Sequence, residues 1–192
     1  ICVGNIYIGG TGKTPTSILL FNELTKLGKK PVIIRKYYKE HNDEYNMIKK
    51  NSINLILCKN RIIGIKEAKK LNYNICILDD GFQDYKIKKD ISIICFNQNQ
   101  LIGNGLILPS GPLRENLNSL KTADIILING NEDENFEKKI LDINKNLKIF
   151  YSSYQPTNLD KFKNQNFCAL AAIGNSENFF KLLEENNLSI KK

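Results

Sequence analysis

A glycine-rich segment near the start of the chain carries residue types suited to phosphate binding. It reads YIGGTGKTP, from Tyr7 to Pro15, and it follows the apolar run ICVGNI. Glycines let backbone N–H groups converge on phosphate oxygens, and the start of a following helix favours an anion. Lys13 has the length to reach the β- and γ-phosphates, and the hydroxyl of Thr14 suits Mg²⁺. The segment predicts a nucleoside triphosphate site made of Tyr7, Ile8, Gly9, Gly10, Thr11, Gly12, Lys13 and Thr14. The alternative is an ordinary glycine-rich turn, since Tyr7 stands where the usual pattern has glycine.

Two adjacent carboxylates follow another apolar run and suggest metal ligands. The run NICILDDGFQD ends in Asp79 and Asp80, with Gly81 next. In P-loop folds, a strand beside the first one brings an acidic side chain to Mg²⁺. Neighbouring residues of an extended strand point to opposite faces, so both carboxylates serve one metal only if the strand ends here, which Gly81 favours. An acidic turn that caps a strand is the alternative.

Two further segments carry charged residues in positions that suit an acceptor or a transition state. The segment LPSGPLREN, 108–116, is a rigid loop that presents Arg114 to an anion, or it is only a structural turn. The segment IIRKYYKEHNDEYN, 33–46, is interpreted as a basic, aromatic loop beside free carboxylates. Such a loop suits a phosphorylated acceptor whose hydroxyl gives up a proton, and a solvated charged loop is the alternative.

The spacing of apolar runs predicts the elements that hold these segments in place. Nearly continuous runs rich in Ile and Val are typical of strands buried on both faces of a parallel sheet. Helical patterns separate several of them, at 15–30, 61–74 and 134–146, with Gly28 as a stop for the first. We therefore expect an α/β fold of the P-loop NTPase type, with three α/β/α layers around a mostly parallel sheet. The predicted strands lie within 1–6, 31–36, 53–58, 74–80, 91–96, 123–130, 147–153 and 167–174.

A polar stretch after residue 150 predicts a domain boundary. Residues 1–150 are expected to form the nucleotide-binding core, and residues 151–192 a linker and the beginning of a second, smaller α/β lobe. This lobe starts with the strand 167–174 and a helix capped near Asn175 or Ser176. The first residue already lies in a predicted strand, and the chain ends just after a strand–helix unit that has no returning strand, so we expect it to be part of a longer protein.

The net charge and the cysteine and histidine content limit the classes of partner and metal site that the sequence predicts. The 192 residues carry a net charge of +8, which favours an anionic partner, but the lysines are scattered and form no block typical of nucleic-acid binding. Five cysteines form no CxxC pair, and His41 is the single histidine, so neither a disulfide framework nor a zinc site is expected. No signal peptide and no long apolar span are present in these residues.

Four motifs in order resemble the tetraacyldisaccharide 4'-kinase family. They read VGNIYIGGTGKTP, ILDDGFQDYKI, GNGLILPSGPLRE and ALAAIGNSENFF, and they cover nearly the whole chain. The family's loop also lacks the first glycine, at the position of Tyr7. The resemblance implies a kinase that uses ATP and Mg²⁺ to phosphorylate the 4'-hydroxyl of a tetraacylated glucosamine disaccharide 1-phosphate. It also implies a place at the cytoplasmic face of the Gram-negative inner membrane. We further expect no nucleic-acid partner and a monomeric protein.

The resemblance also implies roles for individual residues. Asp43 corresponds to the family's proposed general base, whose histidine partner is expected beyond Lys192. A hydrophobic anchor typical of the family is expected before Ile1. Lys36 and Tyr38 stand where the family usually has glycines, and NDEY stands for its Gly-Asp-Glu-Pro. The catalytic set is then Asp43, Lys13 and Asp80; the metal set is Thr14, Asp79 and Asp80; and the acceptor set is Arg35, Tyr37, Gln83, Arg114 and Glu115.

Three alternatives remain from the sequence. The first is a ParA/MinD-like ATPase switch, which places a second lysine where this chain has Ile8. The second is a catalytically silent nucleotide-binding module, and the third is a kinase with a soluble acceptor. The 192 residues alone are expected to be inactive.

Overall fold

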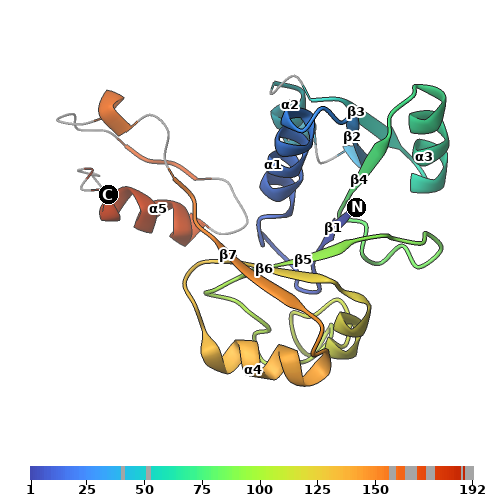
Figure 1. Cartoon of the computed structure of the whole chain (residues 1–192). Helices are drawn as coiled ribbons and strands as arrows, with labels where there is room; N and C mark the ends of the chain where they lie inside the picture. The colour runs from blue at the N-terminus through green and yellow to red at the C-terminus, as the bar shows by residue number, and fades with distance from the viewer. Residues whose placement is uncertain are drawn as a thin grey trace.

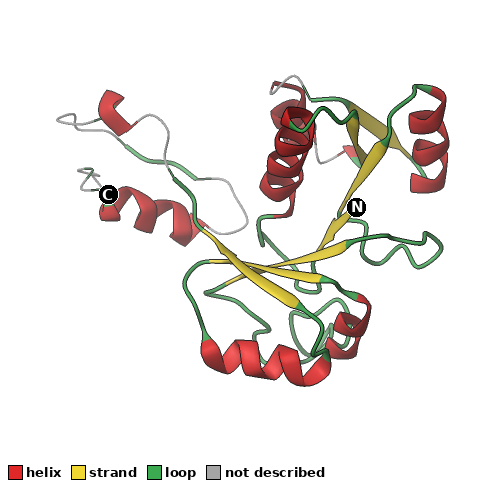
Figure 2. Ribbon diagram, in the orientation of Figure 1, coloured by secondary structure: helices red, strands yellow, loops and turns green. Residues whose placement is uncertain are grey.

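A seven-stranded sheet forms the centre of the molecule (Figures 1 and 2). The structure, a computed structural model, describes residues 1–39, 42–50, 53–155, 159–162, 168–171, 176–186 and 188. All strand pairs are parallel, in the order β3-β2-β4-β1-β5-β6-β7, which confirms the expected parallel α/β sheet. The strands are β1 Cys2–Gly4, β2 Pro31–Lys36, β3 Leu55–Cys58, β4 Ile75–Asp79, β5 Ser92–Asn97, β6 Ile125–Asn129 and β7 Lys148–Ser152.

Helices cover both faces of this sheet, as the three-layer prediction requires. Side chains of α1 and α2 share one buried cluster with Val3, Ile33 and Ile77, whereas α3 and α4 pack on the opposite face. Neighbouring residues of one strand thus contribute to different layers, as the pleat demands. The helices are α1 Lys13–Lys26, α2 Asn42–Lys50, α3 Arg61–Lys70, α4 Glu134–Ile143 and α5 Ser176–Glu185, with short 3₁₀ helices η2 Leu117–Thr122 and η3 Leu159–Lys161.

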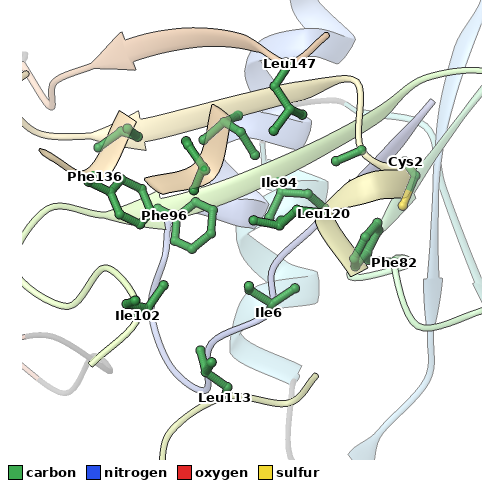
Figure 3. Close-up of a cluster of buried hydrophobic side chains, with 14 residues drawn as sticks. Cys2, Ile6, Phe82, Ile94, Phe96, Ile102, Leu113, Leu120, Phe136 and Leu147 are labelled. Atoms are coloured by element: carbon green, nitrogen blue, oxygen red, sulfur yellow. The ribbon is translucent and has the colours of Figure 1, made fainter. Parts of the chain in front are cut away.

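One apolar cluster anchors three loops that follow the central strands (Figure 3). Ile6 follows β1, Phe82 follows β4, and Leu113 belongs to the loop before η2; each is at most 1% exposed. They pack with Ile94 and Phe96 of β5 in the same cluster. Because every loop has an apolar residue fixed in this core, the polar residues beside these anchors are held in defined positions.

The first prediction concerns the contact between Gly4 and Phe82. A Cβ atom added at Gly4 would overlap the Cβ of Phe82, and neither the strand backbone nor the core leaves room to move. Gly4→Ala is therefore expected to lower the free energy of unfolding by about 1–3 kcal/mol. Urea denaturation measures this change, and an unchanged midpoint would contradict the packing described.

Two sequence-based expectations for secondary structure are wrong. The segment after β2 was expected to be a loop through residue 46, but Asn42–Lys50 forms α2. Its Tyr45 and Ile48 are buried three residues apart, so tertiary packing stabilises a helix there. The strand expected at 167–174 is absent from its described part, 168–171, where Leu170 is 88% exposed and has no adjacent strand to supply backbone hydrogen bonds. The remainder of that segment lies outside the described residues.

The helix expected near Ser176 is present as α5, which lies beyond β7 and away from α3 (Figure 1). The proposed domain boundary at residue 150 remains a prediction. Among the described residues, no helix is both long enough and apolar enough to cross a membrane.

Candidate active site

The glycine-rich turn between β1 and α1 has the shape of a phosphate-binding loop. Gly9 and Gly12 have φ values of 118° and 88°, which glycine adopts without strain. Gly12 is the N-cap of α1 and offers no side chain to the first helical N–H groups. These N–H groups and the positive end of a 14-residue helix therefore face the loop, where they favour an anion.

Asp79 lies at the end of β4 beside the first turn of α1. Its carboxylate accepts hydrogen bonds from the hydroxyls of Thr14 and Ser17, both at 3.2 Å. Arg35 of β2 forms an ion pair with it at 2.8 Å, and both side chains are at most 8% exposed. Complete burial raises the pKa of Asp79, and the charge of Arg35 counteracts this effect. The sequence-based expectation put Arg35 at the acceptor; in the fold it contacts Asp79 and Thr14.

Asp80 directs its carboxylate toward two cations. Strand β4 ends at Asp79, and Asp80 has a φ of 54°, in the left-handed region. Arg114 donates to Asp80 at 2.8 Å, and the ammonium group of Lys13 lies 3.7 Å from the same oxygen. Burial alone would raise the pKa of Asp80, but Lys13 and Arg114 outweigh it, so the pKa lies below its usual value of 3.8. Asp80 is thus an ionised carboxylate beside the phosphate loop.

The two aspartates and Thr14 form a donor set that fits Mg²⁺, because this hard cation prefers carboxylate and hydroxyl oxygens. The ion pairs of Asp79 and Asp80 with Arg35, Lys13 and Arg114 show that positive charge is favoured at these carboxylates. Among the residues that the structure describes, no group of three or more His, Cys, Asp or Glu side chains is suited to a metal. A Mg²⁺ ion at this place would take its remaining ligands from water and from the phosphates of a nucleotide.

Asn5 joins the phosphate loop to the other two loops of the site. Its fully buried side-chain amide donates to the hydroxyl of Thr11 at 2.9 Å, and its side-chain carbonyl accepts from Arg114 at 3.0 Å. The side-chain amide of Gln83 donates to the backbone carbonyl of Asn5 at 2.9 Å. Backbone bonds from Ile8 to Pro112 and from Arg114 to Ile6 reinforce this junction. Arg114 is therefore held beside Asp80 by its contacts with the segment that follows β1.

Glu115 follows Arg114 in the same loop, and its carboxylate interacts with Tyr85. Both carboxylate oxygens of Glu115 are buried and make no hydrogen bond of good geometry within the described residues. Partial desolvation and the adjacent carboxylate raise the pKa of Tyr85 to about 12. The side-chain oxygen of Gln83 is also buried without a partner among the described residues. The carboxylate of Glu115 is thus enclosed beside Tyr85, and the side-chain oxygen of Gln83 is enclosed as well.

The remaining predicted residues follow β2. Tyr37 is half exposed, and its ring stacks on Tyr45 of α2 with centroids 5.8 Å apart. The hydroxyl of Tyr45 accepts from the backbone of Tyr38 at 2.6 Å and fixes the turn. Asp43 belongs to α2, near its start, and its side chain lies outside the described residues. Its contact with the acceptor remains a prediction, as do those of Tyr37, Gln83, Arg114 and Glu115.

Sequence reasoning missed Asn5, Ser17, Arg61 and Asp84, which hold the predicted residues in place. Arg61 is 4% exposed and donates to the backbone carbonyls of Asp79 and Asp80 and to the carboxylate of Asp84. A cation in the first turn of a helix opposes the helix dipole, which is the one feature of the sequence that could have indicated a special role for Arg61. A polar residue within the apolar run ICVGNI is the corresponding feature for Asn5.

A second prediction concerns the pH dependence of Asp84. Partial burial opposes ionisation, but hydrogen bonds from Arg61 and Lys36 hold the pKa of Asp84 below its usual value. The folded state therefore gains stability above the unfolded pKa and loses it as the pH falls through the folded pKa. Asp84→Asn is expected to lower the unfolding free energy by about 1–2 kcal/mol at neutral pH. Urea denaturation should show this difference shrinking toward about pH 3; a difference independent of pH would contradict the ion pairs.

A glycine-rich turn before α1, an acidic end on the adjacent parallel strand and helices on both faces define a P-loop protein of the α/β class. The family model described as tetraacyldisaccharide-1-P 4'-kinase matches residues 1–192. The chain belongs to this family, as the resemblance indicated.

Individual relatives agree with this membership. A tetraacyldisaccharide 4'-kinase from Pelagibacter ubique (strain HTCC1062) is 44% identical over 99% of this chain, which spans 61% of that protein. The protein of the same name from Francisella philomiragia is 32% identical over 99% of the chain and 69% of its own length. The crystal structure of LpxK from Aquifex aeolicus in complex with ATP has a TM-score of 0.72 and 23% identity, covering 99% of this chain and 68% of that one. This structure supports the fold.

Proposed function

We propose that this chain carries the ATP site of a kinase that transfers the γ-phosphate of ATP to the 4'-hydroxyl of a tetraacylated disaccharide 1-phosphate. The observation that carries the proposal is the convergence of Lys13, Arg114 and Asp80 beside the phosphate loop. Two cations and a carboxylate suited to Mg²⁺ meet where the phosphates of a nucleotide would bind. Phosphoryl transfer depends mainly on positioning and charge neutralisation, and this arrangement supplies both.

Each part of the site has a defined task in this proposal. The backbone of Gly9–Thr14 and the start of α1 bind the β- and γ-phosphates, and Lys13 neutralises charge on their bridging oxygen. Thr14, Asp79 and Asp80 hold Mg²⁺, which when bound offsets the charge of the triphosphate. A pocket of about 160 Å³ against this loop, lined in part by Gly12, Asn129 and Tyr154, offers room for part of the nucleoside.

The acceptor is proposed to enter from the side of Gln83 and Glu115. Here a pocket of about 360 Å³ is lined by Gln83, Tyr85 and Lys36, among others, and the buried oxygens of Glu115 lie near Tyr85. Asp43 takes the proton from the sugar hydroxyl, and Arg114 stabilises charge on the transferred phosphoryl group. The acyl chains remain at the cytoplasmic face of the inner membrane, where basic residues contribute about 1 kcal/mol each to binding anionic lipid.

The assay that tests this proposal compares acceptors. The full-length protein is incubated with γ-labelled ATP, Mg²⁺ and either the acylated disaccharide 1-phosphate, a soluble glucosamine disaccharide or no acceptor. Label is expected only in the lipid. Label in the soluble sugar would favour a kinase with a soluble acceptor, ATP hydrolysis that does not depend on an acceptor would favour an ATPase switch, and nucleotide binding without turnover would favour a silent module.

A further inference from the structure

Arg61 contacts the chain on both sides of Asp80 without reaching into the phosphate loop. Its Nη2 atom donates to the carbonyl oxygen of Asp79 at 2.6 Å and to that of Asp80 at 2.8 Å. These two carbonyls belong to the peptide groups that precede and follow the Cα atom of Asp80. A donor that fixes both peptide planes also fixes the direction in which the side chain of Asp80 leaves the backbone.

The conformation held in this way is one that an aspartate does not adopt freely. The φ of Asp80 is 54°, and the left-handed region costs a residue with a Cβ atom on the order of 1 kcal/mol. The next residue, Gly81, allows the chain to turn sharply, but it does not by itself select this conformation for Asp80. The charge-assisted hydrogen bonds from Arg61 to the two carbonyls offset the cost and select the turn.

The guanidinium group is itself held from the other side. Its Nη1 atom donates to Asp84 at 2.6 Å, and the second oxygen of that carboxylate accepts from Lys36 of β2 at 3.0 Å. Arg61 is 4% exposed, so its charge is desolvated and its rotamer is fixed by packing. The group therefore bridges α3, the end of β4 and, through Asp84, the end of β2.

We infer that Arg61 is a positioning residue that sets the carboxylate of Asp80 opposite Lys13 and Arg114, and thereby sets the affinity of the nucleotide site for its divalent cation. The inference rests on the proposed function, in which Asp80 helps to hold Mg²⁺. Arg61 itself is not expected to touch the nucleotide or the metal. Its loss should therefore weaken metal binding while the phosphate cradle formed by Gly9–Thr14 keeps its affinity for metal-free nucleotide.

Titration with Mn²⁺, followed by electron paramagnetic resonance in the presence of saturating ADP, measures this effect directly. In the full-length protein, Arg61→Gln is expected to raise the Kd for Mn²⁺ about tenfold, as is typical when a partner behind a metal ligand is lost. The Kd for ADP in EDTA is expected to stay within about twofold of the wild-type value. The Kd of Arg61→Lys for Mn²⁺ should lie between those of the wild type and Arg61→Gln, because one ammonium group cannot span both carbonyls and Asp84.

Ala68→Gly is the matched control for a purely structural role. Ala68 is fully buried on the same helix, and its replacement weakens α3 without touching Asp79, Asp80 or Asp84. It should lower the unfolding midpoint and leave the Kd for Mn²⁺ unchanged. Added guanidinium ion should restore Mn²⁺ affinity to Arg61→Ala but not alter the Ala68→Gly protein.

The inference is overturned if Arg61→Gln binds Mn²⁺ as tightly as the wild type, or if it loses metal and metal-free nucleotide to the same extent. If Arg61→Gln does not fold, the same two measurements on Arg61→Lys test the inference, and a Kd for Mn²⁺ equal to that of the wild type overturns it. A wild-type protein that binds ADP but shows no Mn²⁺ site would instead remove the metal role of Asp80, and with it the proposed function on which the inference depends.

Discussion

Lys13→Ala is expected to abolish ATP turnover, with a loss of about 10³-fold or more in kcat. The ammonium group of Lys13 lies at the phosphate loop, 17% exposed and 3.7 Å from Asp80, so few other groups can replace its charge. Lys13 is the first residue of α1, and the backbone N–H groups of this helix remain in place in the variant. The variant should therefore keep its fold and lose mainly the neutralisation of the γ-phosphate during transfer.

Lys26→Ala provides the matched control. Lys26 ends the same helix and forms an exposed ion pair with Glu23, so its loss should change turnover less than about twofold. Turnover of the full-length protein is measured as ADP release under saturating ATP, Mg²⁺ and the acylated disaccharide 1-phosphate, with circular dichroism as a check on folding. Undiminished turnover in a folded Lys13→Ala protein would show that the glycine-rich turn is not the phosphate site.

Asp43→Ala is expected to slow phosphoryl transfer by about 10²–10⁴-fold while leaving the Kd for ATP unchanged. The residue belongs to α2, which follows the turn after β2, whereas the nucleotide is proposed to bind between β1 and α1. A base that acts on the acceptor hydroxyl contributes to the chemical step and not to nucleotide affinity. A single-turnover assay with prebound ATP separates the two quantities.

Asn42→Ala is the matched control for Asp43→Ala, because it changes the preceding residue of α2 without removing a carboxylate. It should retain most of the transfer rate. An Asp43→Ala protein as fast as the wild type would remove Asp43 from the mechanism. A variant that lost ATP binding together with transfer would indicate a structural role for the residue.

The strands were the most predictable part of the molecule. Runs such as PVIIRK and ISIICF are nearly continuous in apolar residues because both faces of β2 and β5 are buried, and this pattern depends only on local sequence. The helix α2 was missed because its stability comes from burial of Tyr45 and Ile48 and not from propensity. The segment 168–171 has strand-like composition, but a strand also requires a neighbour, which composition does not reveal.

The candidate site was predictable only in part, for a related reason. Lys13, Asp79 and Asp80 stand in short motifs whose chemistry follows from residue type and spacing. The pairing of Arg35 with Asp79, and of Asn5 with Arg114, joins residues 44 and 109 positions apart. Such contacts depend on the strand order β2-β4-β1, which the sequence alone does not specify. The residues that orient the motifs are therefore visible only in the folded chain.

The most direct test of phosphoryl transfer to the 4'-hydroxyl uses an acceptor that lacks only the oxygen atom of this hydroxyl. The full-length protein is given ATP, Mg²⁺ and the tetraacylated disaccharide 1-phosphate, or the same lipid with hydrogen in place of the 4'-hydroxyl, and the products are resolved by mass spectrometry. We expect one added phosphate on the first lipid, located at the 4' position by fragmentation, and none on the deoxy lipid. Equal phosphorylation of both lipids, or no phosphorylated product from the first, would contradict the proposed function.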